Sequence, residues 1–156
     1  MRFKEVCAFI CLILAALPAS AGDSLVIAMD GELVCEYTYE ELMRFPQTTI
    51  RTNTIWSDGV QEFEGPSLSA ILYDAGLSDG QTLELKSLDH FSIQIQGYTV
   101  SRLYPIVAIS HNGKRMNVRD NGPYRIIYPY DLDKSLRTET VFAQSVRMLV
   151  EINVLE

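Results

Sequence analysis

A strand-like stretch in the first half of the chain ends in small polar residues and the only tryptophan. Residues 51–59 read RTNTIWSDG, in which β-branched residues alternate with hydrogen-bonding ones before Trp56. A core position would require Thr52 and Asn53 to find partners elsewhere, so a pocket rim is favoured over a dry interior. The stretch therefore predicts the rim of a pocket.

A second stretch places two arginines on either side of a glycine turn, in RDNGPYRIIYPYD at 119–131. Gly122 permits close backbone approach to a ligand, and the turn that it forms with Asn121 is expected to leave amide donors uncovered. Arg119 and Arg125 each offer a planar fork of donors. Such a fork suits an anionic group or a heterocycle with urea-like edges. We therefore count these four residues as candidate ligand contacts.

A turn between two strand-like runs adds an acid, Asp89, as a further candidate residue. Each of these features also has a simpler explanation. A turn aspartate commonly hydrogen-bonds its own backbone. The two arginines could be solvated and pair with Asp120 and Asp131, and Trp56 could belong to the core. The sequence leaves these alternatives open.

The residues of the chain give little support to a metal site or a hydrolytic site. The chain has two histidines, His90 and His111, far apart in sequence, and it has no CxxC, HExxH or calcium-loop spacing. It also has no GxSxG elbow and no glycine-rich phosphate loop. A catalytic carboxylate pair is not singled out by any spacing. Metal binding and hydrolysis are therefore not favoured.

The charge of the chain argues against nucleic acid as a partner. The formal net charge is −7 at pH 7, and no run of basic residues interrupts it. An acidic surface of this kind repels phosphate backbones and anionic membranes alike.

The N-terminus resembles a secretory signal peptide, with a basic start, an apolar run and a small-x-small cleavage site. We expect residues 1–21 to be removed and residues 22–156 to form one exported domain. Cys7 and Cys11 leave with the signal, so Cys35 remains alone and no internal disulfide can form.

Strand-like runs dominate the rest of the chain, and turn signals such as Asp-Gly and Asn-Gly separate them. Nine runs are expected: 25–29, 33–37, 48–56, 60–64, 82–88, 91–96, 106–111, 124–128 and 146–155. One short helix is predicted by a capping box at Thr38 and Glu41, and a second by Ser67 as N-cap with Gly76 closing it. These elements predict an α+β, mostly-β single domain.

The order of these signals resembles the molybdopterin-binding domain of the sulfite oxidase superfamily, over about residues 30 to 130. The most specific motifs are F-x-G-x-x-L-x-x-[IL]-L-x-x-A-G at 63–76, S-x-D-x-[FY] at 87–91 and G-P-x-R-[IL]-[IV]-x-P at 122–129. The resemblance implies the sulfite-oxidase-type fold and a site for a pterin. In catalytic members the strand that leads into the first motif carries a molybdenum-ligating cysteine, and here that strand reads TNTIW.

A short, exported form without this cysteine resembles the PruR-type periplasmic pterin-binding proteins. That resemblance implies a non-catalytic protein that binds a reduced pterin, such as a tetrahydropterin. It also implies contact with the periplasmic part of a membrane-bound diguanylate cyclase/phosphodiesterase. The alternatives are a small molybdopterin-dependent oxidoreductase, or its subunit, and an interaction module without a small ligand. The predicted pterin contacts are Thr52, Asn53, Trp56, Asp89, Arg119, Asn121, Gly122 and Arg125.

Overall fold

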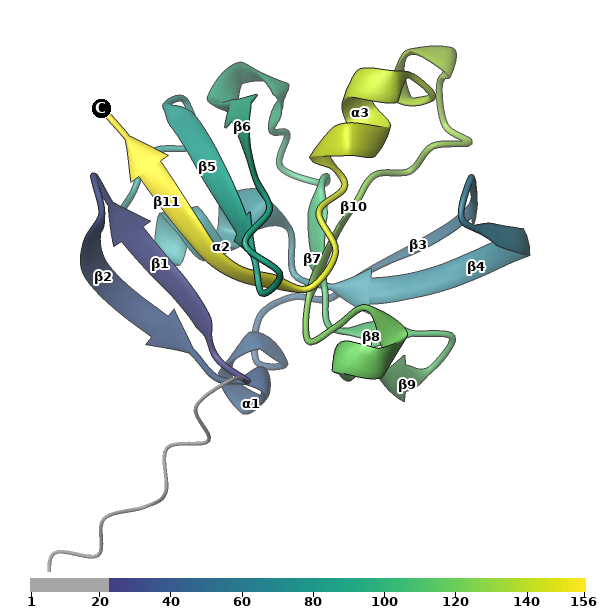
Figure 1. Ribbon diagram of the computed structural model, residues 1–156, viewed down its shortest axis with the longest axis horizontal. Coiled ribbons are helices and arrows are strands. Elements are labelled where there is room, and N and C mark those ends of the chain that lie inside the picture. Colours follow the sequence, from purple (N-terminus) through teal and green to yellow (C-terminus); the bar gives the residue numbers. More distant parts are fainter. Residues whose placement is uncertain (1–22) are drawn as a thin grey trace, which may run out of the picture.

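The computed structural model describes residues 23–156, apart from the side chain of Tyr98, and shows two β-sheets side by side (Figure 1). The predicted signal peptide lies outside the described residues. The protein is an α+β, mostly-β single domain, as the sequence predicted. No helix within residues 23–156 is long and apolar enough to span a membrane.

The larger sheet has five strands in the order β2-β1-β11-β5-β6. Their bounds are β1 Leu25–Met29, β2 Glu32–Tyr37, β5 Thr82–Ser87, β6 Ser92–Gln96 and β11 Leu149–Leu155. Strand β11 pairs in parallel with β1 and antiparallel with β5, so the last strand of the chain lies in the middle of the sheet. Apolar side chains with no exposed surface, among them Leu83, Leu85 and Ile152, form the core on this sheet.

The second sheet has four strands in the order β3-β4-β8-β9. Their bounds are β3 Thr48–Thr54, β4 Ser57–Gly65, β8 Ser110–His111 and β9 Lys114–Arg115, and the pair β7 Ile106–Ala108 and β10 Arg125–Ile127 lies beside them. A Cβ added to Gly65 would lie 2.0 Å from the carbonyl oxygen of Val107. Glycine is therefore required where the long β3–β4 hairpin joins the body of the protein.

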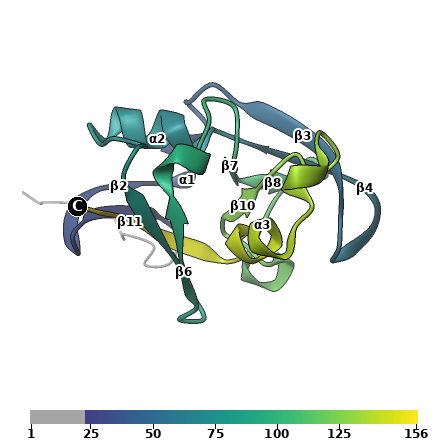
Figure 2. The same cartoon turned by 90° about the horizontal axis from the view of Figure 1, so that it is seen from above.

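Two predicted helices are present, and a third was not predicted. The capping box of Thr38 and Glu41 opens α1 (Tyr39–Leu42), and Ser67 caps α2 (Leu68–Asp74), which lies on one face of the larger sheet (Figure 2). Helix α3 (Glu139–Gln144) begins at a Thr138 cap and lies between the larger sheet and the β3–β4 hairpin (Figures 1 and 2).

Three strand predictions need correction. The run 48–56 ends at Thr54, and Ile55 and Trp56 form the hairpin turn. The run 106–111 divides into β7 and β8. The run 146–155 begins as a strand only at Leu149, because Met148 adopts a positive φ of 51° and Val146 belongs to the preceding loop. The alternation of apolar residues continued across this break and concealed it.

Candidate functional site

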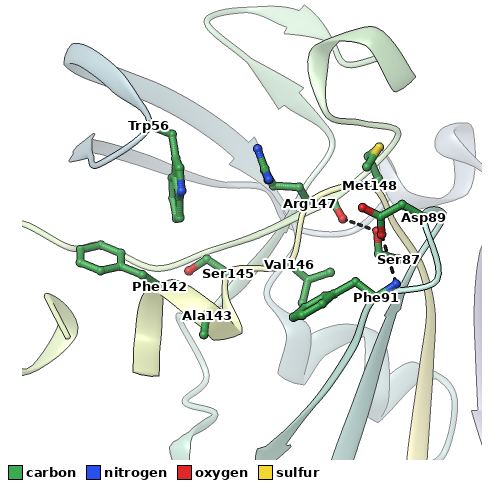
Figure 3. Close-up of a pocket in the computed structure, with 10 residues that line it drawn as sticks. All are labelled: Trp56, Ser87, Asp89, Phe91, Phe142, Ala143, Ser145, Val146, Arg147 and Met148. Carbon is green, nitrogen blue, oxygen red and sulfur yellow. Dashed lines mark hydrogen bonds between the residues drawn. The ribbon is translucent and has the colours of Figure 1, made fainter. Parts of the chain in front are cut away.

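A polar cavity of about 230 Å³ lies where the β3–β4 hairpin, the β5–β6 turn and the segment after α3 meet (Figure 3). Trp56 and Phe142 lie on one side, Asp89 and Phe91 on the other, with Arg147 between them. The complete lining is Trp56, Ser87, Asp89, Phe91, Phe142, Ala143, Ser145, Val146, Arg147 and Met148. Trp56 and Asp89, which the sequence nominated separately, therefore share one cavity.

Trp56 lies in the turn of the hairpin rather than on the strand, and it is 38% exposed. Two rings meet it edge to face: Tyr130, with centroids 6.1 Å apart, and Phe142, at 5.8 Å. The Tyr130 hydroxyl donates to Ser145 Oγ at 2.6 Å, which fixes the first of these rings. Trp56 is thus held by an aromatic cluster while it still lines the cavity.

Arg125 is the most unusual charged residue beside the site. It lies in β10 and is only 5% exposed, with its guanidinium carbon 5.1 Å from the Phe63 ring centroid and 5.9 Å from that of Trp56. Among the side chains that the structure describes, none accepts a hydrogen bond from its Nε, and none of the ion pairs includes it. Burial, and then the nearby Arg147, lower the pKa of Arg125. A buried cation of this kind calls for an acceptor.

His111 packs on the other aromatic neighbour of Arg125. Its ring is stacked on Phe63, with centroids 4.5 Å apart, and its Nε2 lies 2.8 Å from Oε1 of Gln61. Burial and the charge of Arg125 lower the pKa of His111. The neutral imidazole is therefore favoured, which avoids a second positive charge close to Arg125.

Asp89 forms the turn that the simpler explanation predicted, and it also faces the cavity. Its Oδ1 accepts a hydrogen bond from the backbone N–H of Phe91 at 3.2 Å. Hydrogen bonds from Ser87 and then Phe91, with a smaller contribution from Arg147, lower the pKa of Asp89. The carboxylate is ionised at neutral pH and stands close to a guanidinium, so the cavity offers both an acceptor and a cationic donor.

Thr52 and Asn53 are engaged by the protein itself. The backbone N–H and side-chain amide of Asn53 donate to Oδ2 of Asp131 at 2.7 and 2.8 Å. Thr52 is fully buried, and its hydroxyl accepts from the N–H of Asp131 at 3.2 Å. Both residues lie close to Trp56 in sequence, but neither lines the cavity beside it.

The glycine turn is not part of this cavity. Arg119 is exposed and lines a separate hollow with Asp23, Arg115, Met116, Asn117 and Val118. The N–H of Gly122 donates to the carbonyl of Asn117 at 2.7 Å and that of Asn121 to Val118 at 3.2 Å, so the expectation of uncovered amide donors was wrong.

Packing, and not ligand binding, explains why glycine occupies position 122. A Cβ at this position would lie 2.7 Å from Cβ of Met116. Of the two predicted arginines, only Arg125 therefore lies beside Trp56, and it does not form the ion pair with Asp131 that the alternative assigned to it. Asp131 pairs with Arg137 instead.

Eight cavity residues were not predicted: two flank Asp89 in the β5–β6 region, and the other six lie in or after α3, where the sequence indicated a strand or no regular structure. They are Ser87, Phe91, Phe142, Ala143, Ser145, Val146, Arg147 and Met148. The local signal available was the sequence Thr138-Glu139, a helix cap followed by an acid in the first turn.

The donors at the cavity do not fit molybdenum. This soft metal favours thiolate ligands, and Cys35 lies in β2, separated from β5 by β1 and β11. Within residues 23–156 there is no group of three or more His, Cys, Asp or Glu residues able to hold a metal ion. The lining supplies carboxylate, hydroxyl and guanidinium groups with aromatic faces, which suit an organic ring better than a metal.

Comparison with known proteins supports the fold. No protein-family model matches the sequence, and no curated protein matches it. Among solved structures, the chain resembles the sulfane dehydrogenase SoxCD from Paracoccus pantotrophus, with a TM-score of 0.59 and 17% sequence identity. The alignment covers 85% of this chain and 38% of the SoxCD chain, so this protein spans well under half of its length. The likeness shows that this chain shares the fold of part of the SoxCD chain.

Proposed function

We propose that this protein binds a reduced pterin, such as a tetrahydropterin, in the cavity beside Trp56 and does not itself catalyse a reaction. The observation that carries the proposal is the cavity lining, in which the Trp56 ring, the Asp89 carboxylate and the Arg147 guanidinium surround one polar space. A pterin offers ring nitrogens and a carbonyl as acceptors and a flat face for stacking, so it complements both Arg147 and Trp56. Arg125 contacts the Trp56 ring but does not itself line the cavity.

The size and polarity of the cavity support a small ligand. Its volume of about 230 Å³ lies below the roughly 300–1,000 Å³ of sites for drug-sized molecules. A bicyclic ring fits that scale better than molybdopterin with its phosphate-bearing side arm. Arg147 can donate to ring acceptors, and Asp89 can accept from the amino and N–H groups of a pterin.

The direct test is titration of purified residues 22–156 with tetrahydropterin under anaerobic conditions. Trp56 is the only tryptophan, so its fluorescence reports on this cavity alone. We expect saturable quenching with one site, matched by calorimetry, and weaker binding of the oxidised pterin. A flat response by both methods would contradict the proposal.

We further propose that the protein is exported to the periplasm and regulates a membrane-bound cyclic di-GMP enzyme through that enzyme's periplasmic part. The signal-like residues 1–21 and the resemblance to short pterin-binding proteins support this. N-terminal sequencing of the protein from its own host should begin at Gly22. A purified periplasmic receptor domain should bind the pterin-loaded form more tightly than the ligand-free form, and equal affinities would remove the regulatory part.

The likeness to SoxCD supports a second candidate, a molybdopterin-dependent oxidoreductase or its subunit. The absence of a thiolate from the cavity lining counts against it. Elemental analysis of protein purified from its own host distinguishes the two, because stoichiometric molybdenum would favour the oxidoreductase, whereas pterin without molybdenum would favour the binding protein.

A further inference from the structure

A carboxylate outside the cavity ties together two of the segments that carry its aromatic wall. Asp131 belongs to the strap, which we define as residues 128–138 between β10 and α3. Its Oδ2 accepts two hydrogen bonds from Asn53 in β3, and its Oδ1 pairs with a guanidinium nitrogen of Arg137 within the strap. We call Asn53, Asp131 and Arg137 the clamp. Hydrogen bonds from Asn53, and less strongly the charge of Arg137, lower the pKa of Asp131.

The clamp takes the place of a neighbouring strand. Strand β3 is at the edge of its sheet and is paired only with β4. The N–H of Asn53 points away from β4, and the Asp131 carboxylate supplies the acceptor that a further strand would have provided. The N–H of Asp131 returns a hydrogen bond to the Thr52 hydroxyl at 3.2 Å. The two segments are therefore locked in one register.

This register determines the position of Trp56 in the cavity lining. Trp56 follows Asn53 by three residues on the hairpin, and Tyr130 directly precedes Asp131 on the strap. The two rings meet edge to face at 6.1 Å. Tyr130 is in turn bonded to Ser145, which lines the cavity. Slippage between hairpin and strap would separate Trp56 from Tyr130 and widen the cavity at its aromatic side.

We propose that the clamp is a positioning device that holds Trp56 in place and so slows release of the cavity ligand. This inference rests on the proposed function as far as the ligand is concerned, but the positioning of Trp56 stands without it. Asp131 does not line the cavity, so it acts through Trp56 and not by touching the ligand. If Trp56 is already ordered in the free protein, binding costs less conformational entropy and the dissociation rate of the ligand is lower.

The variants Asp131→Asn and Arg137→Gln test the clamp from its two sides. Asparagine at 131 retains an oxygen for Asn53 but turns an amide towards Arg137, and glutamine at 137 removes the cation. Asp133→Asn is the matched control, because it removes the same charge from the same strap. Asp133 contacts the N–H of Ser135 at 2.7 Å and no residue of the hairpin.

The first measurement needs no ligand. Time-resolved anisotropy of Trp56 should show a larger amplitude of fast motion in Asp131→Asn and Arg137→Gln than in Asp133→Asn and the unmodified protein. The second measurement is the release rate of bound tetrahydropterin by stopped flow. We expect release to be about three- to tenfold faster in both clamp variants, with the association rate nearly unchanged. The double variant should be no faster than either single one, because both single variants remove the same ion pair between Asp131 and Arg137.

The outcomes separate the two proposals. If the unmodified protein does not bind pterin, the proposed function fails while the anisotropy still decides the clamp. If Trp56 moves equally in the clamp variants and in Asp133→Asn, the clamp proposal is overturned even where pterin binds. Circular dichroism checks folding of each variant, and if Asp131→Asn does not fold, Arg137→Gln alone decides the result.

Discussion

The five-stranded sheet and the hairpin–strap region are held together by different forces. In the sheet, apolar residues with no exposed surface pack on α2, and each inner strand has neighbours on both sides. Around the cavity, the contacts are polar or aromatic and join segments far apart in sequence: Asn53 with Asp131, Trp56 with Phe142, and Tyr130 with Ser145. We therefore expect the sheet to contribute most of the stability and the hairpin–strap region to contribute the proposed ligand binding, and substitutions should affect the two independently.

The largest effect is expected in the sheet. Leu85→Ala removes a fully buried side chain from β5 and leaves a cavity. It should lower the free energy of unfolding by about 2–5 kcal/mol, measured by urea denaturation. The folded fraction should bind pterin as before. Leu33→Ala in the edge strand β2 is the control, because Leu33 is 63% exposed and its loss should change little. A large loss of affinity in folded Leu85→Ala would contradict the expected independence of stability and binding.

Arg125→Met should move stability and binding in opposite directions. It replaces an uncompensated buried cation with an apolar side chain of similar length. The free energy of unfolding should rise by about 0.5–2 kcal/mol, as when a site strained for function is relaxed. Pterin affinity should fall by up to about tenfold, because Arg125 contacts the Trp56 ring that lines the cavity. Lower stability with unchanged affinity would show that Arg125 is a structural residue.

Trp56→Ala should affect binding much more than folding. The indole supplies a stacking surface and apolar contact that together amount to about 1–3 kcal/mol of binding, so affinity should fall at least tenfold. Its exposed position in the turn limits the cost to stability. Calorimetry must replace fluorescence as the measurement here. Trp56→Phe is the matched control and should retain part of the affinity, since it keeps a smaller aromatic face.

The smallest expected effect concerns pH. The pKa of His111 is lowered in the folded protein by burial and by Arg125. The unfolded chain, with a histidine pKa near 6.5, therefore binds the proton more readily. The contribution of His111 to stability is complete above about pH 6.5 and declines as pH falls below that value. His111→Gln should remove this decline from urea denaturation curves recorded between about pH 7 and pH 5. Identical slopes for both proteins would contradict it.

Local signals predicted the local structure well. The capping box at Thr38 and the Ser67 cap are short-range hydrogen-bonding patterns, and both helices begin where they indicated. The hairpin and strand runs followed from alternation and turn residues. Helix α3 was missed because six residues give too little apolar periodicity to recognise.

The candidate site could be predicted only in part. Trp56 and Asp89 stood out by residue type, and the structure brings them to one cavity. Arg119 and Arg125 looked equivalent in sequence. Arg125 lies in β10 and is buried beside the indole ring of Trp56. Arg119 lies before the glycine turn, is exposed and lines a separate hollow. The pairing of Asn53 with Asp131 joins residues 78 positions apart. No local pattern in a single sequence encodes such a contact.

The central position of β11 affects the order in which the five-stranded sheet can form. Strand β11 lies between β1 and β5 and follows both of them in sequence. Until residues 149–155 are in place, β1–β2 and β5–β6 are two separate hairpins with no strand between them. The five-stranded sheet therefore depends on contacts between distant parts of the chain, which is typical of slow folding.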